Sequence, residues 1–338
     1  MARKSFRGVV ARRVLNMVIT IFGILSLNFA LIHAMPGDPI NNMVPKDPKF
    51  DMSIKWDLVD RFHLNDSLPQ QYVYYLYKTV TLDWGVSYMA PERDVLDIIL
   101  GDLRWTLLLV GVSTTFTIIA GIFVGAYSAY KRGGAFDVGA TSFSLFFYGM
   151  PVFWFALLLQ LLFSSHPLGM AWWPQFPISG YYDTDAFGGE FSWDLPVVLS
   201  VMKHLFLPAL TLTLAMLASV SLVMRSSLID VMTDDFIMTA RAKGLSNRQI
   251  LVRHAVPNGM PPMIALIALE VAFVIGGAYQ VEVIFRYPGI GWRTIKAIGE
   301  LDFPILQFIL VIGGAAVVVA NFLADIVLLY VDPRIRMS

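Results

Sequence analysis

Six long stretches of this chain contain almost no charged residues, and they constrain its fold more than any other feature. A helix needs about 20 mostly apolar residues to cross the hydrocarbon core of a bilayer. The stretches that meet this length cover residues 14–34, 105–130, 138–165, 204–224, 260–284 and 303–330. Lipid offers no partners to backbone polar groups, so only helices or closed barrels span it, and the ten-residue alternating segments of a barrel are absent from the sequence. The sequence therefore predicts an all-α integral membrane protein with six transmembrane helices.

The composition agrees with this fold class and excludes several functions. Hydrophobic residues make up 57% of the chain and charged residues 15%, whereas soluble domains average about 25% charged residues. The 25 basic residues balance the 25 acidic ones, so the chain lacks the excess positive charge that binds nucleic acid, and we expect no nucleic-acid partner. It contains no cysteine, which excludes disulfides, thiol nucleophiles and cysteine-ligated metal sites.

Basic residues are distributed unevenly between the two sides of the expected spans. Lys and Arg gather in the N-terminal tail, in the segment 225–253 and in the C-terminal tail, whereas residues 166–197 contain none. Loops rich in Lys and Arg face the cytoplasm. Both termini of this multi-pass protein of the cell membrane are therefore expected in the cytoplasm, although Arg286, Arg293 and Lys296 would then lie outside.

These assignments divide the chain into successive parts. A cytoplasmic tail, residues 1–13, precedes the first transmembrane helix, residues 14–34. A sizeable extracytoplasmic insert, residues 35–103, separates this helix from a core that covers residues 104–331. Within the core, a long basic loop on the cytoplasmic side, residues 230–258, joins the fourth and fifth spans. Residues 332–338 form a second cytoplasmic tail.

The basic loop has the pattern of two short helices. Asp234 and Asp235 suit the N-terminus of a helix, where the helix dipole favours negative charge. Gly244 suits a left-handed C-terminal cap, Ser246 suits the N-cap of a second helix, and Pro257 is expected to end that helix. Two helices broken at a glycine would form a rigid knob that fills a groove in another protein. A solvated loop without a partner is the alternative.

This loop resembles the EAA loop of ATP-binding-cassette (ABC) importer permeases, whose pattern is a small-residue triplet, a glycine and a later proline. Met238-Thr-Ala240, Gly244 and Pro257 occupy these places, with Met238 where the general pattern has an acidic residue. The form Thr239-Ala-Arg-Ala-Lys-Gly-Leu-Ser246 is similar to the version in dipeptide and oligopeptide permeases. Further stretches match the same family in order, and they are Met35-Pro-Gly-Asp-Pro39, Leu82-Asp-Trp-Gly-Val-Ser87, Phe285-Arg-Tyr-Pro-Gly-Ile-Gly-Trp292 and Val331-Asp-Pro-Arg-Ile-Arg336.

The resemblance implies a type I ABC importer transmembrane fold and a permease subunit that moves dipeptides or oligopeptides by alternating access. Similar permeases carry oligosaccharides or other small solutes. The implied partners are a second homologous permease, two cytosolic ATP-binding subunits, an extracytoplasmic substrate-binding protein and the lipid bilayer. The EAA loop would act as a coupling helix in a cleft of the ATPase, through Thr239, Ala240, Arg241, Ala242, Lys243, Gly244, Leu245 and Pro257.

The sequence itself places ATP hydrolysis elsewhere. It contains no Gly-Lys dipeptide and therefore no phosphate-binding loop of the G-x-x-x-x-G-K-[ST] type. We expect ATP and Mg²⁺ to be bound by the partner ATPase subunits. This chain is then expected to have no cofactor, no metal site and no catalytic residues of its own, and it would not be an enzyme.

A few polar residues lie inside the expected spans, where ionisable groups are candidates for function. Glu270, in the fifth span, would either line the pathway and contact a substrate amine or bond to a neighbouring helix. Asp325 follows Asn321 by one helical turn near the cytoplasmic end of the sixth span, and we expect this pair to form a structural polar clasp. Glu282 and Arg286 are four residues apart and are expected to form an ion pair.

Small residues recur at every fourth position of the second span, at Gly121, Gly125 and Ala129. Such rows allow helices to approach closely in lipid. We expect this row to line the interface with a sister helix or with the partner permease.

Two other classes of function are the alternatives. An intramembrane enzyme would need catalytic motifs such as His-Glu-x-x-His or Gly-x-Ser-x-Gly, and the sequence contains neither. An ion-coupled secondary carrier acting without an ATPase would show inverted repeats and broken helices with several buried charges, which the sequence does not display. Solute uptake by vesicles that hold no ATPase subunit would favour these alternatives.

Overall fold

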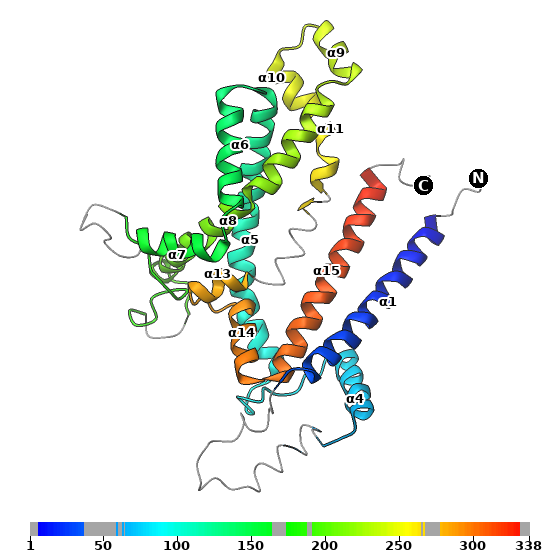
Figure 1. The fold of residues 1–338 in the computed structure, drawn as a ribbon, viewed down its shortest axis with the longest axis vertical. Helices are drawn as coiled ribbons and strands as arrows, with labels where there is room; N and C mark the ends of the chain where they lie inside the picture. Colours follow the sequence, from blue (N-terminus) through cyan, green and yellow to red (C-terminus); the bar gives the residue numbers. More distant parts are fainter. Residues whose placement is uncertain are drawn as a thin grey trace.

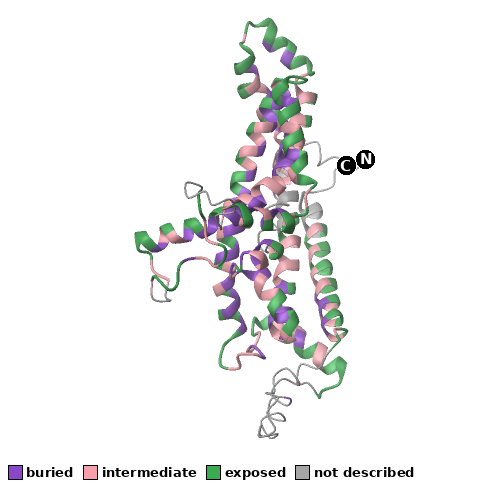
Figure 2. Cartoon of the chain, turned by 60° about the vertical axis from the view of Figure 1, so that its left-hand side comes forward, coloured by how far each residue is buried: buried purple, intermediate pink, exposed green. Residues whose placement is uncertain are grey.

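A computed structural model describes residues 6–36, 59, 63, 65–163, 174–187, 191–264, 266–267 and 278–331 of this chain. Within these ranges the protein is helical, and its extended pairing is limited to an isolated antiparallel bridge between Val86 and Asp94. The helices form an elongated bundle (Figure 1). Exposed residues line the outer faces of the helices and buried residues lie between them (Figure 2).

Three described helices are long and apolar enough to cross a membrane, and they coincide with expected spans. Helix α1 covers Phe6–His33, α5 covers Val95–Tyr130 and α8 covers Leu195–Val231. All three helices begin earlier than the sequence predicted, α1 included, which was expected to begin at residue 14. The last helix, α15, covers Phe303–Val331 and packs along α1 (Figure 1).

The third expected span, residues 138–165, is not one straight helix. Helix α6 covers Ala135–Tyr148 and α7 covers Val152–Phe163, and the two are bent by 101°. Pro151 separates them; it has no N–H to donate and disfavours a helical conformation of the residue before it. Helix α7 therefore runs sideways from the end of α6 (Figure 1).

Short helices complete the two ends of the bundle. Helices α9 (Asp235–Ala242) and α10 (Asn247–Ile250) lie at one end, which we call the knob end. Helices α4 (Leu68–Thr81) and α14 (Ile290–Glu300) lie at the opposite end, which we call the α14 end (Figure 1). Helix α13, Tyr279–Ile284, precedes α14. It forms one end of the fifth expected span, of which residues 265 and 268–277 lie outside the described residues.

Helices α5 and α8 pack against each other with their backbones in contact. A Cβ atom added to Gly121 would lie 2.5 Å from Cγ1 of Val220, and one added to Gly125 would lie 2.8 Å from Cβ of Met224. Ala129, the third member of the row, is buried as well. The small-residue row predicted from the sequence therefore meets a sister helix of the same chain.

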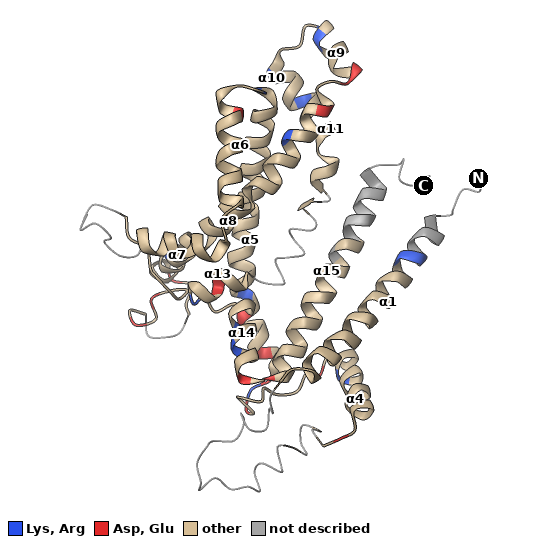
Figure 3. Cartoon of the chain, in the orientation of Figure 1, with Lys and Arg blue, Asp and Glu red and all other residues tan. Residues whose placement is uncertain are grey.

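Charged residues are absent from the middle of the long helices. In Figure 3 the described Lys, Arg, Asp and Glu residues lie toward the ends of these helices and in the segments that join them. Large apolar side chains such as Phe22, Phe116 and Phe123 are more than half exposed in this middle zone. This distribution fits a protein whose central belt contacts lipid.

Candidate coupling site and its anchorage

The basic loop folds into a compact pair of helices that projects beyond α8, and we call residues 234–259 the knob (Figure 1). Gly244 has a φ of +78°, in the left-handed region that residues with a Cβ rarely adopt. The amide of Gly244 donates to the carbonyl of Arg241 (2.9 Å), and the amide of Leu245 donates to that of Ala240 (3.3 Å). This pair of bonds is a Schellman motif, which ends α9 and fixes the direction of the chain after it.

A capping box begins α10 immediately after the glycine. The amide of Gln249 donates to Oγ of Ser246 (3.3 Å), and the amide of Ser246 donates to Oε1 of Gln249 (2.9 Å). Both bonds satisfy backbone groups that a helix start leaves free. The angle between α9 and α10 is therefore set by local hydrogen bonds on both sides of Gly244, as the sequence predicted.

Pro257 does not end the second helix, contrary to expectation. The chain continues from α10 through a π-helical turn, Leu251–Ala255, into α11, Val256–Gly259. In the π-turn the amide of Val256 donates to the carbonyl of Leu251. Pro257 then lies in the first turn of α11, directly after the π-turn.

One face of the knob is anchored in the bundle. Ile237 and Ala240 of α9 and Ile250 of α10 are buried, and they belong to one apolar cluster with Met224 and Leu228 of α8. Burial of a large aliphatic side chain contributes about 1.5–3 kcal/mol to the stability of the fold. The knob is consequently a rigid extension of α8.

The opposite face of the knob is open. Phe236 and Met238 are 39% and 64% exposed, so this face presents apolar surface beside cationic groups. Of the residues assigned to coupling by the sequence, Ala240 is buried and Leu245 is half-buried. The exposed members of that set are Thr239, Arg241, Ala242, Lys243, Gly244 and Pro257.

An ion pair between the half-buried Arg225 and the buried Asp137, not found from the sequence, ties α6 to α8 near the knob. Nε of Arg225 donates to Oδ1 of Asp137 (2.6 Å), and a second guanidinium N–H donates to Oδ2 (2.8 Å). The amide of Gly133 donates to Oδ2 as well (2.9 Å). The partners are 88 residues apart, so no local pattern in the sequence indicates this contact.

At the α14 end, Glu282 does not pair with Arg286 as the sequence predicted. Arg286 is exposed, whereas Glu282 is fully buried. The Glu282 carboxylate accepts hydrogen bonds from Oγ1 of Thr106 (2.9 Å) and from the amide of Trp292 (3.0 Å), in the first turn of α14. A Cβ added to Gly289 would lie 2.5 Å from this carboxylate. The motif Phe285–Trp292 therefore joins α5, α13 and α14, and its glycine allows the close approach.

Two further polar contacts hold the same end together. Nε of Arg293 on α14 donates to Oδ2 of Asp102 on α5 (2.5 Å). Asp302 accepts a hydrogen bond from Oγ of Ser87 (2.5 Å) and from the amide of Tyr88 (3.1 Å). The first contact joins α14 to α5, and the second attaches the segment before α5 to the turn between α14 and α15.

The intramembrane polar residues are only partly described. Asn321 is exposed on α15, and Asp325 follows it one turn later in the same helix. The Asp325 side chain lies outside the described residues, and so do Glu270 and residues 332–338.

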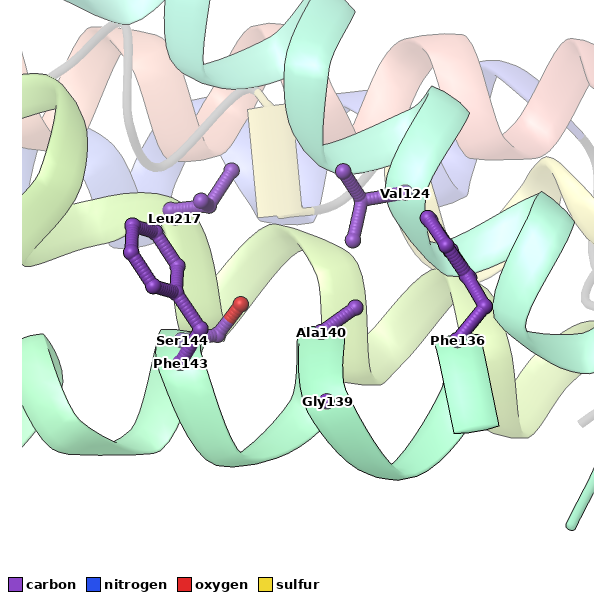
Figure 4. Close-up of a pocket in the computed structure, with 7 residues that line it drawn as sticks. All are labelled: Val124, Phe136, Gly139, Ala140, Phe143, Ser144 and Leu217. Carbon is purple, nitrogen blue, oxygen red and sulfur yellow. The ribbon is translucent and has the colours of Figure 1, made fainter. Parts of the chain in front are cut away.

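An apolar hollow of about 410 Å³ lies between α5, α6 and α8 (Figure 4). Its only polar side chain is Ser144, which is 1% exposed and whose hydroxyl has no hydrogen-bond partner among the described residues. A hollow with this lining suits an apolar group rather than the charged terminus of a peptide. The residues that line it are Val124, Phe136, Gly139, Ala140, Phe143, Ser144 and Leu217.

The fold is that of the membrane component of an ABC importer. The MetNI methionine ABC transporter in an inward-facing conformation superposes with a TM-score of 0.52 at 14% identity, over 70% of this chain and 97% of that one. A family model described as "Binding-protein-dependent transport system inner membrane component" matches residues 98–337. This chain belongs to that family. It is a multi-pass membrane protein and a transport permease subunit rather than an enzyme.

Curated relatives match over almost their whole length. The oligopeptide transport system permease protein AppB of Bacillus subtilis (strain 168) is 33% identical over 97% of this chain and 98% of the relative. The di/tripeptide transport system permease protein DppB of Pseudomonas aeruginosa (strain UCBPP-PA14) is also 33% identical, with the same coverage. The dipeptide transport system permease protein DppB of Escherichia coli (strain K12) is 31% identical, again over 97% of this chain.

Proposed function

We propose that this chain is the permease subunit of an ATP-driven importer of dipeptides or oligopeptides. The names of its relatives, which match across nearly the full chain, support this substrate class. Two partner subunits would bind ATP and Mg²⁺, because this chain has no phosphate-binding loop. A second homologous permease and a substrate-binding protein on the extracytoplasmic side would complete the transporter.

The observation that carries the coupling role is the construction of the knob. Its buried face is rigidly attached to α8, while its open face combines apolar Phe236 and Met238 with the cations Arg241 and Lys243. A groove with an apolar floor and an acidic rim would complement this face. Movement of an ATPase that holds the knob would then displace α8 directly and reorient the spans by alternating access.

In this arrangement the knob end faces the cytoplasm and the α14 end faces outward. The basic loop and the basic N-terminal tail support this orientation. Both termini of the chain would lie in the cytoplasm, and solute delivered by the binding protein would enter at the α14 end.

A pair of matched glycine variants tests the coupling role. Gly244 and Gly133 have φ values of +78° and +75°, and a Cβ on either would meet no atom within 4 Å. Valine imposes the same local strain at both positions, but Gly244 lies in the knob and Gly133 lies in the turn before α6. We expect Gly244→Val to insert normally while losing co-purification of the ATPase subunits and ATP-dependent peptide uptake in proteoliposomes. Gly133→Val should retain both.

Two results would contradict the proposal. Equal retention of the ATPase by the two variants would exclude the knob as the docking element. Peptide uptake by vesicles that contain the permease without any ATPase subunit would exclude an ABC importer altogether and favour a secondary carrier.

A further inference from the structure

Helix α4 lies at the periphery of the α14 end, beside the last turns of α1 (Figure 1). We propose that α4 is a lipid-embedded helix whose outward face contacts the hydrocarbon of the membrane leaflet at this end. The contact surface consists of Val73, Tyr77 and Val80, which we call the α4 stripe. The segment between the first and second spans would then be held at the membrane surface rather than projecting freely from it.

Three polar contacts set the depth of α4 along α1. The hydroxyls of Tyr72 and Ser26 lie 2.7 Å apart, and Nδ2 of Asn28 donates to the hydroxyl of Tyr75 (3.2 Å). Nε2 of His33 lies 2.8 Å from Oε1 of Gln71. Because Ser26 precedes His33 by seven residues, these contacts extend along about 10 Å of α1 at 1.5 Å per residue.

Apolar packing extends the contact further into the span. Leu25 of α1, Tyr75 of α4 and Val311 of α15 form one buried cluster, against which Ile21 and Trp84 also pack. The segment Arg12–His33 of α1 is one of the apolar stretches long enough to cross the membrane. Helix α4 therefore lies beside the terminal part of a membrane span, at the depth of hydrocarbon.

The α4 stripe faces away from this packing. Val73, Tyr77 and Val80 are spaced by four and three residues, which places them on one side of a helix, and they are 66%, 64% and 80% exposed. The buried Tyr75 lies on the opposite side. An apolar face this exposed is costly in water and favourable in lipid.

Polar groups of α4 have hydrogen-bond or ion-pair partners within the chain, because lipid offers them none. The hydroxyls of Thr79 and Thr81 donate to the helix's own carbonyls, of Tyr75 (2.8 Å) and Tyr77 (2.9 Å). Lys78 forms an ion pair with Asp83. The inward hydroxyls bond to α1, and the phenol of Tyr77 is of the kind found at the membrane–water boundary.

The neighbouring surface of α1 favours lipid over a protein partner. Phe22, Leu27 and Leu31 of α1 are all more than half exposed, and in a membrane span such residues contact lipid. The α4 stripe carries no charge that would select a protein, and it lies at the depth of this lipid-facing surface.

Site-specific photo-crosslinking identifies what covers the stripe. The photoreactive residue p-benzoylphenylalanine replaces Val73, Tyr77 or Val80 in turn, within the assembled transporter in native membranes, and adducts are identified by mass spectrometry. Leu27 on α1 serves as the lipid-facing control and exposed Asp185 as the water-facing control.

We expect phospholipid adducts at all three stripe positions and at Leu27, and none at Asp185. Placement at Tyr75 should instead give crosslinks to α1 within the chain. Adducts to another protein chain at the stripe would overturn the proposal in favour of a subunit or binding-protein interface. Absence of any adduct at the stripe, with Leu27 reacting normally, would place it in water and would overturn the proposal as well.

Discussion

The contact between α5 and α8 leads to a specific prediction, because it requires glycine, which has only a hydrogen atom in place of a side chain. A Cβ at Gly125 would overlap the carbonyl oxygen of Ser221 and lie 2.8 Å from Cβ of Met224 and 3.1 Å from the amide nitrogen of Arg225. Two of these atoms belong to the backbone of α8, which cannot rotate away. In the variant Gly125→Ala the two helices must therefore separate locally.

The expected cost follows from this geometry. Overpacking of a well-filled interior costs about 1–3 kcal/mol, and it outweighs the gain of up to about 1 kcal/mol that alanine offers over glycine inside a helix. Gly111, in the same helix, has no atom within 4 Å of its added Cβ. The variant Gly111→Ala should consequently be neutral or slightly more stable than the unmodified chain.

The difference in stability between the two variants is measured by unfolding them in mixed micelles with increasing sodium dodecyl sulphate. Tryptophan fluorescence reports on it, because Trp105 of α5 is buried in the core against Tyr181 and Phe191. Gly125→Ala should lower the free energy of unfolding by about 1–3 kcal/mol relative to Gly111→Ala, because the gain in helix propensity is common to both variants and cancels. Equal stability of the two variants would refute a backbone-to-backbone α5–α8 contact.

Two further predictions use the same unfolding assay. Gly289→Ala should destabilise the chain by about 1–3 kcal/mol because its Cβ would collide with the buried carboxylate of Glu282, whereas Gly299→Ala, with open space around it, should not. Arg225→Met should cost on the order of 3 kcal/mol by leaving the buried Asp137 carboxylate without its cation, and an additional apolar replacement of Asp137 should recover most of the loss.

Features that depend on local sequence were predictable. Apolar stretches of sufficient length indicated α1, α5 and α8, because the hydrocarbon core sets a minimum length for a helix that crosses it. The Schellman motif at Gly244 and the cap at Ser246 were predictable for the same reason, since each depends on a few neighbouring residues.

Two predictions failed because a rule about neighbouring residues was overridden by the fold around them. Glu282 and Arg286 had the spacing of a helical ion pair, yet helix α13 ends at Ile284 and Arg286 adopts a positive φ of 46°. The Glu282 carboxylate instead binds Thr106 and the start of α14, a contact between residues 176 positions apart. Pro257 was expected to end a helix, but the π-turn before it allows the helix to continue.

The polar contacts also show how a displacement of the knob would reach the far end of the molecule. The knob is packed on α8, and α8 is packed on α5 through glycines that leave no compressible side chains between the two backbones. At the other end of α5, Asp102 and Thr106 bind α14 and Glu282, so α8, α5 and α14 form one continuous rigid path. The break at Pro151 lies outside this path: α6 is fixed to α8 by Arg225, while α7 donates a hydrogen bond from Gln160 to the carbonyl of Ile284 in α13 (3.1 Å). Because rigid elements move together and helix breaks absorb the change in angle, we expect the α6–α7 bend, rather than the α5–α8 contact, to change when the knob moves.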